Sequence, residues 1–343
     1  MSGSSNAMPP EPPLTIFRWA QTWNAPNYNP ERRAPQPPAE RVEVGKNTTN
    51  KSFKMEDIAR GILEWDINID TIRELASILD APYDWNAYGK EFRPMREFFP
   101  DIFPSRFNRE VVLANRLVTT LFNDLSRCQN YIIAHHERVP TWYPSDFIPT
   151  FTEVGATCLQ TETWSSPHPP VPDCATIGTE DRPLQVTNRP ATRLPGDVKC
   201  SYKFQASWRQ YTDPVNRREG VNKSRSEGTQ AMKAEYEKVM AQINHYMEFP
   251  GGVGFERAAK YGYIITDEEV VLVRRAPVNV RDVPGGSYTQ LYASRGFPLR
   301  RAEKGPVPRT YISGMLAVLW IHILVGCTDP KNSYVMLRPY FVE

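Results

Sequence analysis

Polar and apolar residues alternate strictly over residues 196–204, which read GDVKCSYKF. Successive side chains of a β-strand point to opposite faces, so this pattern predicts a strand. One face would carry the polar side chains of Asp197, Lys199, Ser201 and Lys203, and the other would carry Val198, Cys200, Tyr202 and Phe204. Charges are costly to bury unless they are paired or hold a metal ion. The strand is therefore either an edge strand with a solvated polar face or part of a charged site.

Other short segments also have the pattern of strands. Residues 173–177 form a short candidate strand upstream of this one. Residues 261–266 and 270–274 are rich in β-branched and aromatic residues, and the acidic residues 267–269 between them indicate a hairpin turn. Residues 142–164 mix the signals of strand and helix and predict neither.

Apolar residues at helical spacing predict helices over residues 109–133, 229–248 and 311–326. The first is capped by Asn108, and the last is an apolar helix that covers a sheet. The spacing of Ile58, Ile62, Leu63 and Trp65 predicts a further helix that starts near residue 55 and ends before Pro82. We therefore expect an α/β domain over residues 105–343, preceded by a helical extension over residues 55–104.

The N-terminal segment lacks a sustained period. Residues 1–7 are small and polar and precede a second methionine, which is typical of an expression-tag remnant. Residues 8–54 are rich in proline and polar residues and indicate an extended or disordered arm. Within it, Phe17, Trp19 and Trp23 provide apolar surface that would dock on the body of the protein or on a protein partner.

Composition narrows the class of protein. The net charge is only +2, so nucleic-acid binding would depend on local clusters of basic residues. The five cysteines are scattered without a C-x-x-C pair, which argues against a disulfide framework or a zinc site. No signal peptide is visible, and the apolar run at 312–325 is shorter than the roughly 20 residues that span a membrane. These features favour an intracellular protein of the nucleus or cytoplasm that is not inserted in a membrane.

Two carboxylates and one amine would meet if the two upstream strands pair. Asp173 follows Pro172 at the start of the first strand, and Asp197 and Lys199 share a face of the second. Two carboxylates together with water and a phosphate oxygen suit Mg²⁺ or Mn²⁺. An ammonium group beside such an ion would orient water or neutralise charge on phosphorus. The residues Asp173, Asp197 and Lys199 therefore indicate a phosphodiesterase centre.

This combination resembles the signature of the PD-(D/E)XK nuclease superfamily in its D-x-K form. Downstream, Gln242 and Tyr246 resemble the Q-x-x-x-Y motif of the exonuclease-like branch, and at positions i and i+4 they share one helical face. The sequence of residues 110–325 is similar to that of a group of fungal PD-(D/E)XK nuclease-like proteins. The resemblance implies a restriction-endonuclease-like core, with a mixed central sheet flanked by helices in the order α-β-β-β-α-β.

The resemblance also implies an acidic residue on the helix before the first core strand. Glu110 lies on a well-formed predicted helix, and Glu153 is nearer in sequence to Asp173. Both stay open as that residue, with Glu110 preferred. Cys174 and Cys200 each follow a site residue, so we expect both side chains to point into the core.

A basic insertion at about residues 213–228 separates the D-x-K strand from the Q-x-x-x-Y helix. It contains the candidate nucleic-acid-binding residues Arg217, Arg218, Lys223 and Arg225. Such side chains bind backbone phosphates, although a solvated loop also explains a run of charges. Further basic residues would extend this track: Arg274, Arg275, Arg295, Arg300, Arg301 and Lys304.

Two functions follow from these patterns. The first is a metal-dependent nuclease, a hydrolase of DNA or RNA that uses Mg²⁺ or Mn²⁺. The alternative is a weakly active or inactive nuclease-fold module that binds nucleic acid or a protein partner. A small-molecule enzyme has little support, because the chain lacks a glycine-rich phosphate loop and a G-x-S-x-G motif.

Overall fold

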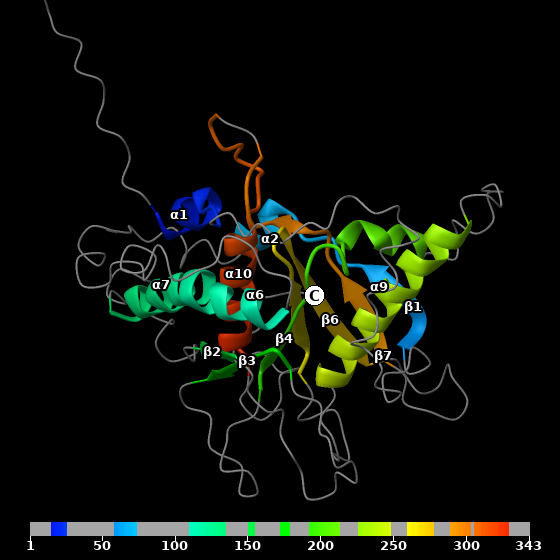
Figure 1. Cartoon of the computed structure of the whole chain (residues 1–343). Helices are drawn as coiled ribbons and strands as arrows, with labels where there is room; N and C mark the ends of the chain where they lie inside the picture. The colour runs from blue at the N-terminus through cyan, green and yellow to red at the C-terminus, as the bar shows by residue number, and fades with distance from the viewer. Residues whose placement is uncertain are drawn as a thin grey trace, which may run out of the picture.

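The computed structural model describes residues 15–25, 58–73, 110–134, 150–154, 172–178, 192–212, 226–247, 259–277, 289–302 and 305–328. Within these residues the fold is an open, mixed sheet with helices on both faces (Figure 1). Seven of its strands lie in the order β1-β7-β6-β5-β4-β3-β2, and the two-residue β8 (Phe297–Pro298) pairs with β6. The α/β class predicted from the sequence is confirmed.

The strands of the sheet are short. They comprise β1 (Ile58–Glu64), β2 (Thr150–Val154), β3 (Cys174–Gly178), β4 (Leu194–Val198), β5 (Tyr261–Ile265), β6 (Glu269–Pro277) and β7 (Thr289–Ala293). The pairs β1–β7 and β4–β5 are parallel, and the remaining neighbours are antiparallel. The predictions of a strand after Asp173 and of a β5–β6 hairpin are confirmed.

Alternating side chains of the central strands supply two hydrophobic cores. On one face, Tyr263, Ile265 and Leu272 pack with α10 (Gly314–Gly326) and with the helices α6 (Glu110–Leu117) and α7 (Asn123–Ala134). On the other face, Ile264, Val271 and Val273 pack with α9 (Ser226–Met247) and the 3₁₀-helix η5 (Ala206–Tyr211). Figure 1 shows α9 and α10 on opposite sides of the sheet.

Helix α10 is the buried helix that its apolar sequence predicts. All thirteen of its residues are buried. It begins at Gly314 because the Ser313 hydroxyl accepts a hydrogen bond from the amide of Leu316, which caps the helix. Among the described residues, no helix has the length and apolarity that crossing a membrane requires.

The long helix predicted over residues 109–133 is confirmed with one irregularity. Between α6 and α7 the chain adopts a π-helical turn, η3 (Val118–Phe122). The helix predicted over residues 229–248 is also confirmed as α9, which starts slightly earlier. Both helices bury one apolar stripe against the sheet.

The helix predicted from residue 55 is wrong over Ile58–Glu64, where the chain forms strand β1. Ile58 and Ile62 are four residues apart, a spacing that fits one face of a helix or of a strand. Gly61 has φ of +75° at a register shift of the β1–β7 pairing, a conformation that a helix does not accept. Pairing with β7 therefore decided the structure of this segment, and among the described residues the helical prediction holds at α2 (Ile69–Arg73).

The N-terminal arm is helical rather than extended over α1 (Ile16–Thr22). Its Gln21 amide donates to the carbonyl oxygen of Tyr311 at 2.8 Å, and the Ser313 hydroxyl donates to the carbonyl oxygen of Ala20 at 2.6 Å. The indole of Trp23 donates to Asp124 Oδ2 at 2.9 Å. Of the two docking sites predicted for this segment, the body of the protein is confirmed by these contacts.

The strand predicted over residues 196–204 is displaced toward the N-terminus. Strand β4 already includes Leu194 and ends at Val198. The amide of Lys199 still donates to the carbonyl oxygen of Ile265 at 2.9 Å, but the amide of Lys203 then turns back to the carbonyl oxygen of Cys200. Ser201 and Lys203 therefore lie in a turn rather than on the face of a strand.

Candidate active site

Asp173 and Asp197 meet where β3 begins and β4 ends. Cys174 pairs with Gly196 in the antiparallel register, so Asp173 lies opposite Asp197 one position further along. The amide of Val198 donates to Asp173 Oδ2 at 2.9 Å, which replaces a backbone partner at the start of β3. The predicted convergence of these two carboxylates is therefore what the strand pairing produces.

Gly196 makes this end of the sheet possible. A Cβ atom at this position would overlap the ring of Tyr263 on the neighbouring strand β5. The absence of a side chain lets β4 lie flat beside that ring, with Asp197 directed to the opposite face. Cys174 and Cys200 are fully buried in the core that includes Tyr263, as predicted.

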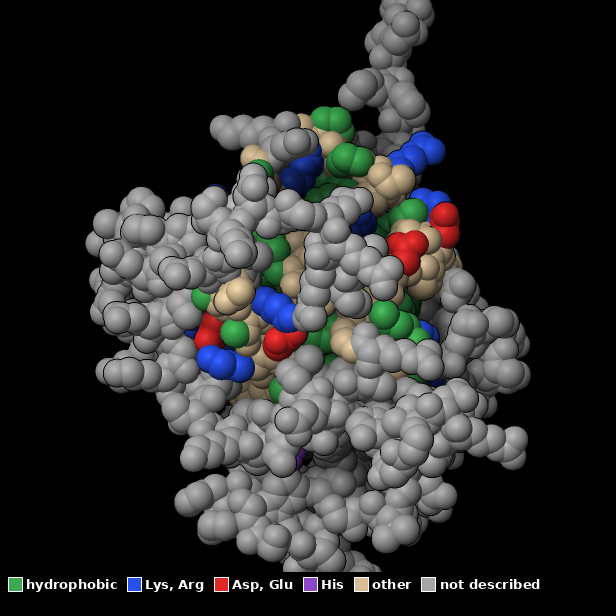
Figure 2. All heavy atoms as spheres, turned by 90° about the vertical axis from the view of Figure 1, so that its right-hand side faces the viewer, with side chains coloured by type: hydrophobic (Ala, Val, Ile, Leu, Met, Phe, Trp, Pro, Cys, Tyr) green, Lys and Arg blue, Asp and Glu red, His purple; other side chains and the backbone are tan. Residues whose placement is uncertain are grey.

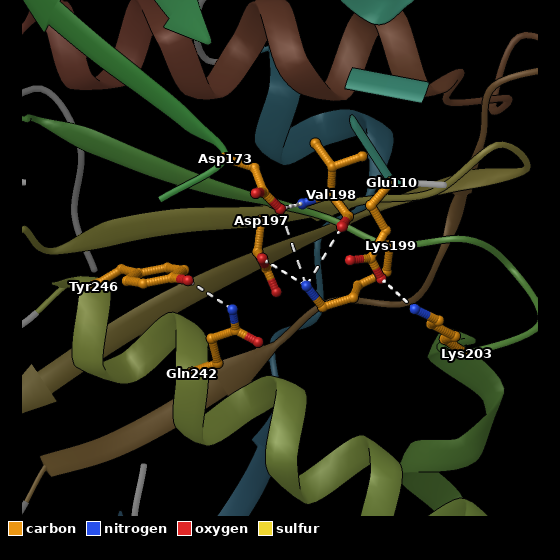
Figure 3. Close-up of polar contacts among 8 residues, drawn as sticks. All are labelled: Glu110, Asp173, Asp197, Val198, Lys199, Lys203, Gln242 and Tyr246. Carbon is orange, nitrogen blue, oxygen red and sulfur yellow. Dashed lines mark hydrogen bonds and ion pairs between the residues drawn. The ribbon is translucent and has the colours of Figure 1, made fainter. Parts of the chain in front are cut away.

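Lys199 lies between the two carboxylates (Figure 3). Its Nζ atom donates to Asp197 Oδ1 at 2.8 Å and lies 4.0 Å from Asp173 Oδ2. The exposed fraction is 0 % for the side chain of Asp197, 8 % for Lys199 and 38 % for Asp173. A buried ion pair of this kind is costly to desolvate and adds little net stability. Stability alone therefore does not account for this pair, which makes it a candidate for a functional role.

The electrostatics of the pair follow from burial and from three carboxylates. Burial would lower the pKa of Lys199, but Asp197, Glu110 and Asp173 together raise the pKa above its ordinary value. Burial raises the pKa of Asp197, the Lys199 ammonium opposes that rise, and the Asp173 carboxylate adds to it. The Lys199 ammonium thus favours the ionised form of Asp197, which burial and Asp173 disfavour, and a second nearby cation would favour it further.

Gln242 and Tyr246 project from α9 toward Asp197 and Lys199, as Figure 3 shows. The Gln242 Nε2 atom donates to the Tyr246 hydroxyl at 2.6 Å, and both side chains are mostly buried. Burial raises the pKa of Tyr246, and the charges of Asp197 and Lys199 also act on it, which fits their proximity. The Oε1 atom of Gln242 is buried without a hydrogen-bond partner among the described residues.

Glu110 reaches the same site from the first turn of α6. Its Oε1 atom accepts a hydrogen bond from Lys203 Nζ at 3.1 Å, and its charge contributes to the raised pKa of Lys199. The alternative, Glu153, lies on β2, where its backbone pairs with Ala175. The long helix thus brings Glu110 to the site despite its distance from Asp173 in sequence.

The residues fit a divalent cation through the two aspartates. Among the described residues, no group of three or more His, Cys, Asp or Glu side chains gathers around one point. The Oδ2 atom of Asp197, however, is buried without a hydrogen-bond partner in the described part of the chain, and Asp173 is adjacent. An unpartnered buried carboxylate oxygen is what a hard cation would bind. Asp173 and Asp197 are therefore the residues that would hold Mg²⁺ or Mn²⁺.

The predicted basic track is only partly described. Arg217, Arg218, Lys223, Arg225 and Lys304 lie outside the described residues. Arg274 packs between the rings of Trp65 and Tyr292, and Arg301 donates to carbonyl oxygens of its own loop. The coloured side chains in Figure 2 include both signs of charge. On α9, Lys233 is paired with Glu237 and Lys238 with Glu235.

Three contributors were not named as site residues from the sequence. Ser201 and Lys203 carried a signal, because they belong to the polar half of the alternating pattern. Asp267 accepts hydrogen bonds from both the amide and the hydroxyl of Ser201, yet in the sequence it marks only a hairpin turn. No local spacing in the sequence relates Ser201 to Asp267. The parallel pairing of β4 and β5 brings the two residues together.

Comparisons with known proteins do not assign the chain to a family. No protein-family model matches the chain, and no curated protein matches its sequence.

Proposed function

We propose that this protein is a metal-dependent nuclease that hydrolyses phosphodiester bonds of DNA or RNA on a restriction-endonuclease-like core. The observation that carries the proposal is the buried Asp197–Lys199 pair beside Asp173, with one Asp197 oxygen left unpartnered. The order of elements supports it: helices α6–α7, strands β2, β3 and β4, helix α9, then strand β5 parallel to β4. Among the described residues, these elements are compatible with the α-β-β-β-α-β order that the resemblance implies, and this supports the proposal.

Asp173 and Asp197 would hold Mg²⁺ or Mn²⁺, which when bound polarises a phosphoryl oxygen and makes a water molecule more acidic. The rest of the proposed chemistry belongs to the protein. The carboxylates around Lys199 favour its ammonium form, so we assign it the role of a positive charge rather than of a base. At the boundary of β4 it lies beside both aspartates, where it would neutralise negative charge that develops on phosphorus.

Gln242 and Glu110 complete the polar surroundings. The unpartnered Oε1 atom of Gln242 offers an acceptor to water or to a nucleotide, while Tyr246 holds the amide in place through Nε2. Glu110 adds negative charge near Lys199 and is itself held by Lys203. Both side chains thus have a fixed orientation before substrate arrives, which is what electrostatic catalysis requires.

The test is cleavage of labelled DNA and RNA by the purified protein with Mg²⁺, with Mn²⁺ and with a chelator. We expect Asp197→Asn and Lys199→Met to lower the cleavage rate by roughly a hundredfold or more, because each removes a charge from the reacting region. Asp70→Asn and Lys238→Met remove exposed charges and should leave the rate unchanged. If wild type and the two site variants show the same trace activity, the protein is not this nuclease.

A second candidate is a nuclease-fold module that binds nucleic acid or a protein without cutting. One observation favours it: Lys199 already occupies Asp197 Oδ1, and Glu110 is paired with Lys203 rather than directed at the aspartates. Calorimetric titration with Mn²⁺ separates the two candidates. The nuclease predicts uptake of metal that Asp197→Asn removes, whereas the binding module predicts ligand binding that the same substitution leaves intact.

A further inference from the structure

In the turn between β5 and β6, the carboxylates of Asp267 and Glu269 accept hydrogen bonds from residues outside the turn. Thr266 closes this turn, because its hydroxyl accepts from the amides of Glu268 and Glu269 at 3.1 and 3.0 Å. The amide of Thr266 also donates to the carbonyl oxygen of Glu269 at 2.8 Å. The side chains of Asp267 and Glu269 are not needed to form the turn, so their contacts require another explanation.

Asp267 holds the chain two residues after Lys199. Its Oδ1 atom accepts from the amide of Ser201 at 2.7 Å, and its Oδ2 atom accepts from the hydroxyl of Ser201 at 2.9 Å. Both residues are buried. Burying a carboxylate costs free energy that two charge-assisted hydrogen bonds offset, so this pair fixes the backbone at Ser201.

Glu269 holds the other end of the same segment. Its Oε1 atom accepts from the amide of Ala206 at 2.7 Å, at the start of η5, where the N-cap residue Gln205 makes no side-chain capping bond. Gly296 lies against this carboxylate, and a Cβ atom there would overlap it. The turn thus supplies in trans a cap that the local sequence lacks.

The segment fixed in this way carries both lysines of the candidate site. The amide of Lys199 is bound to Ile265, Ser201 to Asp267, and Ala206 to Glu269. From this segment Lys199 reaches Asp197, and Lys203 reaches Glu110. Strand β5 and the carboxylates of the turn after it therefore bind the backbone of the segment from which these two ammonium groups project.

We infer that Asp267 is a positioning residue of the candidate active site, which acts through Ser201 on the segment that bears Lys199 and Lys203. For its catalytic consequence the inference rests on the proposed nuclease function. A displacement of about 1 Å in a reacting group lowers a rate by up to roughly a hundredfold. A carboxylate that never touches the substrate would thus control the placement of groups that do.

The first measurement is amide hydrogen exchange, which needs no activity. In Asp267→Ala, the amides of Lys199 and Ser201 should exchange roughly tenfold faster than in wild type, because two hydrogen bonds are lost. Asp267→Asn keeps an acceptor for the Ser201 amide and should stay close to wild type. Glu268→Ala removes an exposed carboxylate from the same turn and should change nothing at these positions. Wild-type exchange of both amides in Asp267→Ala would overturn the inference.

The second measurement is steady-state cleavage. Asp267→Ala should lower kcat about tenfold or more with little change in KM, and Asp267→Asn should recover most of it. An unchanged kcat in a variant with faster exchange would also overturn the inference. If wild type does not cut, the proposed function fails, and hydrogen exchange alone decides whether Asp267 holds the segment. Should Asp267→Ala not fold, Ser201→Ala removes one of the two bonds and predicts the same changes at smaller size.

Discussion

The helices on the two faces of the sheet differ in the surroundings of their buried polar groups. Helix α10 is buried on all sides, and its His322 is bonded through Nδ1 to Thr150 Oγ1 at 3.1 Å, far from the candidate site in sequence and element. Helix α9 is buried on one side, and there it presents Gln242 and Tyr246 toward the Asp197–Lys199 pair. One helix supplies core volume, and the other supplies side chains of the proposed site.

The difference shows which buried polar atoms indicate function. Near α10, Gln129 Oε1 accepts from both the amide and the hydroxyl of Thr150, while Gln129 Nε2 and His322 Nε2 are buried without a hydrogen-bond partner among the described residues. Near α9, polar atoms of Gln242 and Asp197 are left unpartnered beside charged groups. Unpartnered buried atoms therefore occur on both sides of the sheet. What distinguishes Gln242 and Asp197 is the buried ion pair with Lys199 beside them, which makes their free oxygens candidates for binding a ligand.

The largest stability effect should come from the α10 side. Leu319→Ala removes a fully buried side chain, so we expect the free energy of unfolding to fall by about 2–5 kcal/mol, measured by urea denaturation. Leu63→Ala is the matched control, because 41 % of Leu63 is exposed, and should change stability by less than about 0.5 kcal/mol. Cleavage per folded molecule should stay at the wild-type level. A large loss of that activity in Leu319→Ala would end the distinction between the two faces.

The sequence patterns predict correctly those helices and strands whose structure follows from the periodicity of their own residues. The apolar sequence of α10 and the stripe of α9 predicted helices because burial follows the helical period in each. The same holds for β5 and β6, where β-branched residues are concentrated. Of the candidate site, Asp173, Asp197, Lys199, Gln242 and Tyr246 were named from local motifs, and the structure brings all five together.

Elements that depend on distant partners were not predictable in this way. Strand β1 has a spacing that fits helix or strand, and parallel pairing with β7 selects the strand. The turn that follows β4 is bonded at Ser201 to Asp267, which lies on another strand connection. Lys203 was expected on the face of a strand beside Lys199, but the turn directs it to Glu110. Such contacts join residues that no local period relates.

The pH dependence of stability tests whether the buried ring of His322 on α10 stays neutral in the folded protein. Burial lowers its pKa to about 3 from an ordinary value of 6.5. Below pH 6.5 the unfolded chain binds a proton that the folded protein refuses, so the free energy of unfolding should fall as pH falls, by about 1.4 kcal/mol per unit. Above pH 6.5 both states are neutral at this residue, and it contributes no slope.

The measurement compares wild type with His322→Gln by urea denaturation at several pH values. Subtracting the variant removes the contribution of carboxylates common to both proteins. The stability advantage of wild type should shrink by roughly 2 kcal/mol between about pH 7 and pH 5. If the difference in free energy of unfolding between wild type and variant stays constant over this range, His322 accepts a proton in the folded state. Its ring on α10 would then not be neutral.

The smallest stability effect and the sharper functional one should come from α9. Tyr246→Phe removes the hydroxyl that accepts from Gln242 Nε2 and should cost about 1 kcal/mol of stability, because a buried donor loses its partner. Cleavage should nevertheless fall about tenfold, since the Gln242 amide beside Asp197 is no longer held in one orientation. Gln242→Leu in the Tyr246→Phe background should cost less stability than the sum of the single changes, because neither partner is then left unpaired. A Tyr246→Phe protein that loses stability but cleaves at the wild-type rate would make α9 a structural helix like α10, with the chemistry confined to the strand ends.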